Sequence, residues 1–429
     1  MKSKFLGCCI IIALAISSYA GATWVQFGTG ETTETTVLKS NDSHTIVEFT
    51  VPGMDVRDTV VDGTTYQIIS VPTAGIPDEV GKPQTPVINR TVAVDPSKGV
   101  ELNILEVECD TLSGFYIWPV QEPIPELMGV GPPEFVIDTV AYSQDSFYPD
   151  IVSEISDPMI WRDYRIVKLH CNPIQFNPVT GELRAYSRVK VSIDYSGTSD
   201  KNVLDKSLGP TPNYDKLYRD FIINYDYVTP KGPPGEGAYL IITHDDFYNA
   251  ILPFAEWKHK KGIWTEVVKF SDINTGAPDS ADIHNYIKWA YTNWLVPLEY
   301  VLLVGDVDFL ACGYRPGSGC MPDGKYATDH CYSLIAGDDI FSDVYVGRLP
   351  ANTTVECSTM VDKLINYERN PYMTATDWYK KYTGVCITQA GRIFDYTTGV
   401  IGHILDDYGY IQTDSLNSPL PQAISDSIE

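Results

Sequence analysis

Basic residues are scarce in this sequence, and their scarcity limits the partners that the protein can bind. The 429 residues include 31 Lys and Arg against 56 Asp and Glu, a net charge of −25 at pH 7. A chain this acidic, without a basic patch, is repelled by nucleic acid and by anionic lipid. The composition therefore argues against nucleic acid and anionic lipid as partners.

Long apolar runs are also absent beyond the N-terminus, since no later segment approaches the roughly 18 residues of a membrane span. The N-terminus has Lys2 and Lys4, an apolar stretch from Phe5 to Ile16, and small residues through Ala22. This order is typical of a secretory signal peptide. We predict a signal peptide over residues 1–22 and a mature chain that is secreted or held at the cell surface, with no membrane span.

Cysteines are few and are not spaced as in a zinc site. Cys8 and Cys9 leave with the signal peptide, so seven of the nine remain: Cys109, Cys171, Cys312, Cys320, Cys331, Cys357 and Cys386. An odd number leaves at least one thiol unpaired, and no Cys-x-x-Cys spacing occurs. Cys312, Cys320 and Cys331 share the loop region 312–331, and a disulfide between two of them is an alternative.

Residues 23–196 follow a period of two that is typical of strands. His44–Val51, Val100–Glu108 and Val189–Tyr195 alternate apolar and polar side chains, with Pro and Gly between the runs. This pattern predicts an antiparallel all-β sandwich. Residues 197–236, rich in Gly, Pro and Asp, are predicted to be a linker with a short helix near Tyr218–Asn224.

From residue 237 onward strands alternate with helices, which predicts an α/β domain with a mainly parallel sheet. Glu299–Val304 is a continuous apolar run, as a strand covered on both faces requires, and Gly305 and Asp306 follow it. Ligands of such sheets bind beyond the carboxyl ends of the strands, so Asp306 is a candidate site residue. A simple Gly-Asp turn is the alternative interpretation. Farther on, Thr353–Glu356 forms a capping box that predicts a helix start.

Several separate segments together match the pattern of one peptidase family. They are Ala238–Thr243, Ala255–Gly262, Tyr300–Asp306, Thr328–Tyr332, Asp343–Arg348 and Asn366–Arg369. On these segments the chain resembles the gingipain family of secreted cysteine peptidases, peptidase family C25. Its N-terminal half, with Gly81–Pro86 and Asn177–Leu183, is similar to the propeptide of that family.

The resemblance implies a fold, an activity and an organisation. It implies a caspase-like peptidase domain over residues 237–429, incomplete at its C-terminus, and a β-sandwich propeptide over residues 23–196 that covers the enzyme. The implied enzyme is a cysteine endopeptidase that cleaves proteins and peptides with a thiolate and a His as proton carrier. In the family the catalytic His and Cys follow strands that come later in the chain than the segments matched here. We therefore expect this Cys/His dyad beyond Glu429 and no catalytic residue in this chain. The fragment by itself is expected to be inactive.

Some aspartates are candidates for binding within this family pattern. Asp395 is the nearest match to the acidic residue that contacts the substrate side chain in arginine-cleaving members. The resemblance implies Ca²⁺ as a family ion but no required cofactor, and the candidate ligands are Asp306, Asp329, Asp338 and Asp343. A solvated acidic loop is the alternative. The histidines at 244, 330 and 403 are interpreted as structural.

A second hypothesis comes from another class of protein. The same β-sandwich and α/β domain would serve an exported binding or surface-attachment protein without catalysis. Sequence beyond Glu429 distinguishes the two hypotheses, because the peptidase requires a further strand with His-Gly and then an apolar strand that ends in Cys.

Overall fold

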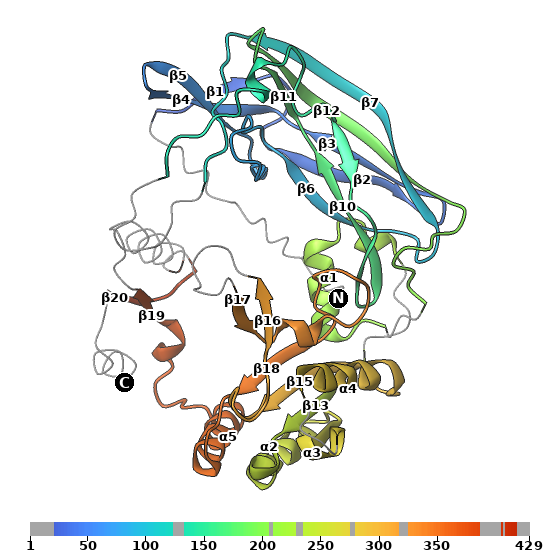
Figure 1. Ribbon diagram of the computed structural model, residues 1–429, viewed down its shortest axis with the longest axis vertical. Coiled ribbons are helices and arrows are strands. Elements are labelled where there is room, and N and C mark those ends of the chain that lie inside the picture. The colour runs from blue at the N-terminus through green and yellow to red at the C-terminus, as the bar shows by residue number, and fades with distance from the viewer. Residues whose placement is uncertain are drawn as a thin grey trace, which may run out of the picture.

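The computed structural model shows an all-β region and an α/β region joined by a linker (Figure 1). It describes residues 21–122, 133–205, 209–228, 235–274, 279–316, 325–386, 405 and 408–417. The predicted signal sequence up to residue 20, the candidate Asp395 and residues 418–429 lie outside the described residues.

The β region consists of antiparallel sheets that share one core. β3 (His44–Thr50) and β12 (Glu182–Ser196) lie in the sheet ordered β11-β12-β3-β2, and β10 (Tyr164–Cys171) lies centrally in the sheet ordered β6-β10-β8. Val47 of β3 and Val191 of β12 are fully buried, whereas polar residues alternate with them. The predicted strands at His44–Val51 and Val189–Tyr195 are therefore confirmed.

The other elements of this region are mostly short strands at the edges of the sheets. They are β1 (Thr23–Gln26), β2 (Glu34–Ser40), β4 (Gly53–Val61), β5 (Thr64–Ser70), β6 (Ile88–Ala93), β7 (Gly99–Ser113), η1 (Ala141–Ser143), β8 (Ser153–Ile155), β9 (Met159–Trp161) and β11 (Ile174–Asn177). β1, β4 and β5 form a sheet of their own, and the long β7 pairs with β12.

The α/β region is built on four parallel strands. Their order is β14 (Thr265–Lys269), β13 (Ala238–Thr243), β15 (Leu298–Val304) and β18 (Tyr345–Leu349). Successive residues of a strand face opposite sides. Leu240 and Ile242 pack with residues of α4 (Ser280–Asn293), whereas Ile241 packs with residues of α2 (Tyr248–Lys260) and α5 (Thr354–Arg369). Helices thus cover both faces, which confirms the predicted parallel sheet.

Side-chain caps mark the starts of α4 and α5 in this region. Asp279 caps α4 by accepting hydrogen bonds from Ala281 N and Asp282 N, and Thr353 Oγ1 accepts one from Glu356 N at 3.2 Å. Asp245, shortly before α2, does not cap that helix. Its carboxylate accepts hydrogen bonds from Ser271 instead, and residues Asp245–Phe247 form a 3₁₀ turn, η3, before the helix begins.

Shorter elements complete the α/β region. They are α3 (Phe270–Ile273), the hairpin β16 (Gly313–Pro316) and β17 (Lys325–Thr328), η4 (His330–Ser333), η5 (Asp377–Lys380), and the parallel pair β19 (Lys381–Cys386) and β20 (Gln412–Asn417).

The linker carries α1 (Pro212–Phe221) and the 3₁₀ turn η2 (Tyr225–Tyr227). The helix predicted near Tyr218–Asn224 therefore lies earlier than expected. Pro212 stands in the first turn, where it favours a helix start, and Ile222 has extended backbone angles that end the helix. Tyr214 and Tyr218 of α1 are buried between the β region and the α/β region.

Glu368, near the end of α5, fastens this helix to α2. Its carboxylate accepts hydrogen bonds from Lys258 Nζ at 2.7 Å, Lys261 Nζ at 2.8 Å and Trp257 Nε1 at 2.9 Å. Burial by itself would raise the pKa of Glu368, but these donors outweigh it and lower the pKa from 4.5 to about 2. The folded state therefore favours the ionised form. The resulting stability is complete above pH 4.5 and is lost as the pH falls towards 2.

We predict that Glu368→Gln lowers the free energy of unfolding at pH 7 by about 1–3 kcal/mol, because two lysines lose their acceptor charge. The variant should also lose part of the pH dependence between pH 4.5 and 2. Urea unfolding at pH 7 and pH 3 measures both effects. Glu266→Gln, at an exposed position of β14, is the matched control, and an equal loss in the control would contradict the prediction.

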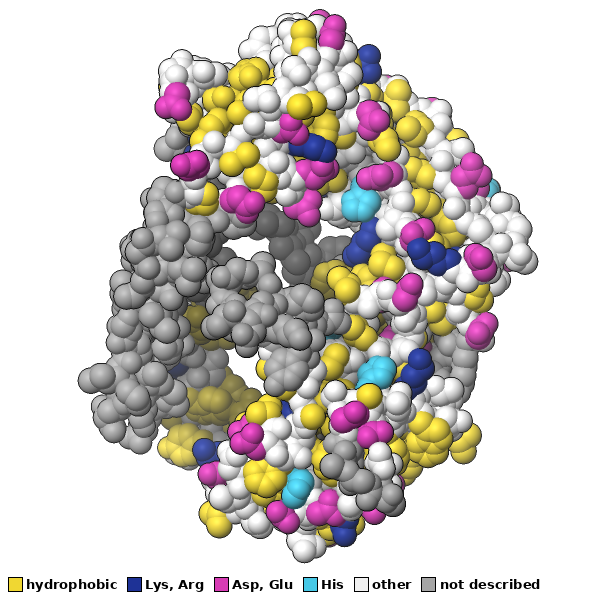
Figure 2. All heavy atoms as spheres, in the orientation of Figure 1, with side chains coloured by type: hydrophobic (Ala, Val, Ile, Leu, Met, Phe, Trp, Pro, Cys, Tyr) yellow, Lys and Arg dark blue, Asp and Glu magenta, His cyan; other side chains and the backbone are white. Residues whose placement is uncertain are grey.

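The surface agrees with the acidic composition. Asp and Glu side chains lie over both regions on the face shown in Figure 2, and Lys and Arg lie singly among them. In the described parts of the chain, no helix combines the length and apolar character that crossing a membrane requires.

Candidate functional site

The carboxyl edge of the parallel sheet is the first candidate site. Gly305 follows β15 with a φ of 136°, and a Cβ there would lie 3.0 Å from Phe309 Cβ, so the tight turn requires glycine. Asp306 N donates to Ala351 O at 3.0 Å, and the Asp306 carboxylate accepts hydrogen bonds from Val307 N at 2.7 Å and Asn352 Nδ2 at 3.3 Å. Asp306 thus shapes the turn at this edge.

Arg348 braces the same edge from the end of β18. Its Nε and Nη2 donate to the two oxygens of Asp329, both at 2.8 Å. Its Nη1 donates to Gly305 O at 2.8 Å and Leu310 O at 2.9 Å. The planar guanidinium therefore joins β18, the turn after β15 and the segment before η4. Both carboxylate oxygens of Asp329 are therefore occupied by hydrogen bonds from Arg348.

The histidines are placed among structural contacts. His244, just after β13, packs its ring against Phe309 and accepts a hydrogen bond from Asp246 N at 3.3 Å. His330 Nδ1 lies 3.2 Å from Ser333 Oγ, while the neighbouring Cys331 Sγ donates to Thr328 O. The third candidate, at position 403, lies outside the described residues.

Asp343 lies at the opposite, amino edge of the sheet, just before β18, and is fully buried. Its Oδ2 accepts hydrogen bonds from Ile335 N at 2.8 Å and Ala336 N at 2.7 Å, and its Oδ1 accepts one from Arg162 N at 2.9 Å. Burial raises the pKa of Asp343 to about 6, although these three donors act against the rise. Asp343 thus organises the loop before β18 and contacts the β region.

The four aspartates proposed as calcium ligands do not form one group. Asp306 and Asp329 lie at the carboxyl edge, and Asp343 lies at the amino edge. Asp338 accepts a hydrogen bond from Asn202 Nδ2 of the linker. Among the described residues no group of three or more His, Cys, Asp or Glu side chains is arranged to hold a metal ion. These residues do not fit a calcium site, and we derive no step through calcium.

Arg162 makes a fully buried polar contact between the two regions. It belongs to the two-residue turn between β9 and β10, and its side chain is fully buried. Nη1 donates to Leu298 O at 2.7 Å and to Asp343 O at 2.5 Å, both at the amino edge of the sheet. The guanidinium lies over the ring of Tyr214, 4.6 Å from its centroid. Sequence reasoning missed Arg162, because arginine is almost never fully buried unless paired.

Backbone and aromatic contacts surround Arg162. Ile160 N of β9 donates to Asp339 Oδ2 at 2.8 Å, and Tyr214 OH donates to Ser342 O at 3.1 Å. Around them, one apolar cluster combines the β region, the linker and the α/β region: Ala93, Met159, Trp161, Tyr164, Ile166, Tyr214, Leu217, Tyr218, Ile222, Tyr225, Val228, Phe341 and Tyr345. The two regions are therefore packed together and not merely tethered.

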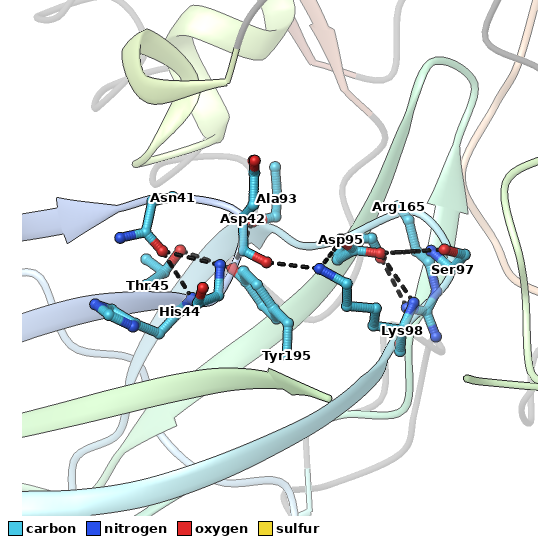
Figure 3. A network of polar contacts seen from close by, with 11 residues as sticks. Asn41, Asp42, His44, Thr45, Ala93, Asp95, Ser97, Lys98, Arg165 and Tyr195 are labelled. Carbon is cyan, nitrogen blue, oxygen red and sulfur yellow. Dashed lines mark hydrogen bonds and ion pairs between the residues drawn. The ribbon is translucent and has the colours of Figure 1, made fainter. Parts of the chain in front are cut away.

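A second polar network lies within the β region, beside a cavity of about 310 Å³ (Figure 3). Lys98 Nζ donates to Asp42 O at 2.7 Å and pairs with Asp95 at 3.0 Å. Arg165 donates to Asp95 O and Lys98 O, and also to Ser199 Oγ and Lys201 O at the start of the linker. These groups fasten the linker to the β region.

Comparison with protein families gives two consecutive matches. The model named Propeptide_C25 matches residues 26–226, and the model of peptidase family C25 matches residues 233–417. The chain belongs to peptidase family C25. The propeptide match spans the β region with α1 and η2, and the peptidase match spans the α/β region, so the contact around Arg162 joins the two parts of a gingipain-like C25 chain.

The similar curated proteins are gingipains of Porphyromonas gingivalis. Gingipain R1 is 27% identical over 341 residues, which are 77% of this C25 chain and 33% of the relative. Gingipain R2 of strain ATCC 33277 is 25% identical over 420 residues, 96% of this chain and 55% of the relative. Lys-gingipain W83 is 23% identical over 90% of this chain and 22% of the relative. The chain thus spans about half or less of these relatives.

Two solved structures are also similar to this C25 chain. The complex of P. gingivalis RgpB pro- and mature domains has a TM-score of 0.40 and 22% identity, over 44% of this chain and 97% of that one. The crystal structure of the Arg-specific cysteine proteinase gingipain R has a TM-score of 0.39 and 27% identity, over 47% of this chain and 46% of that one.

Proposed function

We propose that this chain is part of the precursor of a secreted cysteine endopeptidase. In this proposal residues 1–22 direct export, residues 23–196 form the propeptide, residues 197–236 are the linker, and residues 237–429 belong to a caspase-like peptidase domain. The observation that carries it is the order of the two family matches in one chain, propeptide before peptidase.

The proposed reaction is hydrolysis of a peptide bond by a Cys and a His beyond Glu429, so this stretch by itself is inactive. The thiolate sulfur bonds to the carbonyl carbon, the carbon–nitrogen bond breaks, and the imidazolium gives its proton to the leaving amine. Water then hydrolyses the thioester and restores the thiol. Backbone N–H groups stabilise the oxyanion, and no cofactor takes part. Asp395 is proposed to contact the substrate side chain.

The contact between the two regions supports latency of the precursor. Arg162, Asp343 and the aromatic cluster bury polar and apolar groups between the propeptide and the peptidase region. A contact of this kind holds the propeptide in place until it is cut away. In this proposal the mature enzyme acts on protein or peptide substrates outside the cell.

The test is thiol-dependent proteolysis by the product of the whole gene. After the linker is cut, we expect cleavage of a fluorogenic peptide library and complete loss of cleavage with iodoacetamide or with Ala in place of the downstream Cys. Cys109→Ser controls for alkylation of the exposed thiol of the β region and should keep full, iodoacetamide-sensitive activity. Cleavage that survives alkylation, or no cleavage by the processed protein, would contradict the proposal.

A further inference from the structure

The contact made by Arg162 has the features of a ligand in a binding site. Its guanidinium is enclosed by the carbonyl oxygens of Leu298 in β15 and of Asp343 before β18, by the ring of Tyr291 in α4 and by the ring of Tyr214 in α1. Arg162 Nε also lies 3.4 Å from Asp163 Oδ2. Carbonyl oxygens and aromatic faces both attract a cation, and the planar guanidinium contacts both kinds of group. Only Nη1 makes hydrogen bonds, whereas Nε and Nη2 are buried without a hydrogen-bond acceptor among the described residues.

The backbone of Arg162 is recognised as well as its side chain. Its N–H donates to Asp343 Oδ1 at 2.9 Å, while its Nη1 donates to the carbonyl oxygen of the same aspartate. Asp343 thus contacts both ends of one arginine residue. Such a paired contact selects an arginine within a polypeptide over a free cation.

The backbone conformation at position 162 indicates that the buried contact, and not the turn, favours arginine there. Arg162 has a φ of 49°, in the left-handed region that asparagine or glycine adopts readily and that a long side chain rarely adopts. An arginine here is unfavourable for the turn itself. Strain of this kind persists where surrounding contacts hold the residue, and it is found most often at functional positions.

The Arg162 contact and the carboxyl edge lie at opposite ends of the parallel sheet. Leu298 is the first residue of β15, and Asp343 stands two residues before β18. Both are at the amino edge, whereas Gly305, Asp306 and Arg348 lie at the other end of the same strands. Occupation of one edge therefore does not cover the other.

We infer that the α/β region carries an arginine-binding site at the amino edge of its sheet, which Arg162 fills in the precursor and which takes an arginine of a polypeptide once the β region leaves. The inference rests on the proposed function only in that the β region separates together with α1. Tyr214 leaves with α1, so the site that remains consists of the carbonyl oxygens of Leu298 and Asp343, the Asp343 carboxylate and the ring of Tyr291. The ligand is an arginine in a tight turn, with its own backbone N–H presented to Asp343.

Chemical rescue in the full chain tests the site. Arg162→Ala removes the guanidinium, and we expect the thermal midpoint to fall by roughly 5–10 °C. Millimolar ethylguanidinium should then recover at least half of the loss in a saturable way, and ethylammonium should recover much less, because it cannot stack on the rings. Arg188→Ala, on the surface of β12, should show no rescue by either cation. An unchanged midpoint, no rescue, or equal rescue by both cations would overturn the inference.

A competition experiment covers the case in which Arg162→Ala does not fold. A site-specific protease sequence is placed between Val228 and Gly235, and the chain is nicked after folding. We expect N-acetylarginine methylamide to reduce co-elution of the two parts in a concentration-dependent way, while the neutral isostere N-acetylcitrulline methylamide leaves it unchanged. No effect of the arginine probe, or an equal effect of both, would overturn the inference. Neither experiment measures proteolysis, so each proposal can fail while the other stands.

Discussion

Replacing Arg348 with alanine is expected to lower the free energy of unfolding by about 3–5 kcal/mol. The side chain is 11% exposed and joins both oxygens of Asp329 to the carbonyl oxygens of Gly305, Leu310 and Ala311. Its removal leaves a carboxylate without its counter-ion and buried carbonyl groups without donors. Equilibrium urea unfolding followed by tryptophan fluorescence and circular dichroism measures the loss.

Two further variants test the cause of this loss. Arg188 also bonds to several carboxylates, those of Glu48, Glu106 and Glu108, but on the surface of the β region. Because water and salt screen such pairs, Arg188→Ala should change stability little. The double variant Arg348→Met with Asp329→Asn should recover part of the loss, since no unpaired charge remains. Equal effects of Arg348→Ala and Arg188→Ala would show that burial of the network does not matter.

Replacing Asp343 with alanine is the second change with a large expected effect, again about 3–5 kcal/mol. Three buried backbone N–H groups, those of Arg162, Ile335 and Ala336, lose their acceptor. Two of them shape the loop before β18 and the third crosses to the β region, so both the loop and the contact between regions should weaken. Urea unfolding and limited proteolysis of the full chain measure the two effects.

Asp343→Asn separates these two roles. Its single amide oxygen can still accept hydrogen bonds from Ile335 N and Ala336 N, but its NH₂ group then faces the N–H of Arg162. We expect the loop to survive and the contact between regions to weaken, with a loss of stability between those of wild type and Asp343→Ala. Protease cleavage of the linker that is equally slow in wild type and Asp343→Asn would contradict a role of this carboxylate between the regions.

Local patterns made much of the architecture predictable. The alternation along β3 and β12, the apolar run of β15 and the cap at Thr353 each depend on residues a few positions apart. Such signals are legible in one sequence because the covering layers only require one face or both faces to be apolar. Family resemblance added the order of propeptide and peptidase, which the two family matches confirm.

The roles of the charged residues were not predictable in the same way. Asp343 and Asp329 were candidate calcium ligands through the family resemblance, yet one accepts hydrogen bonds from three backbone N–H groups and the other pairs with Arg348. A carboxylate binds a metal, an N–H group or a guanidinium with the same oxygens. Only the neighbours brought by the fold decide among them.

The sequence by itself determined the acidic character of the chain, its β and α/β regions and its family, because these depend on composition and on short-range pattern. Only the tertiary structure decided how the two regions are joined. The acceptors of Arg162 lie 136 and 181 residues away and are backbone carbonyl groups, which every residue possesses and no sequence motif marks. Burial of an arginine depends on where those carbonyl groups converge, and that convergence exists only in the folded chain.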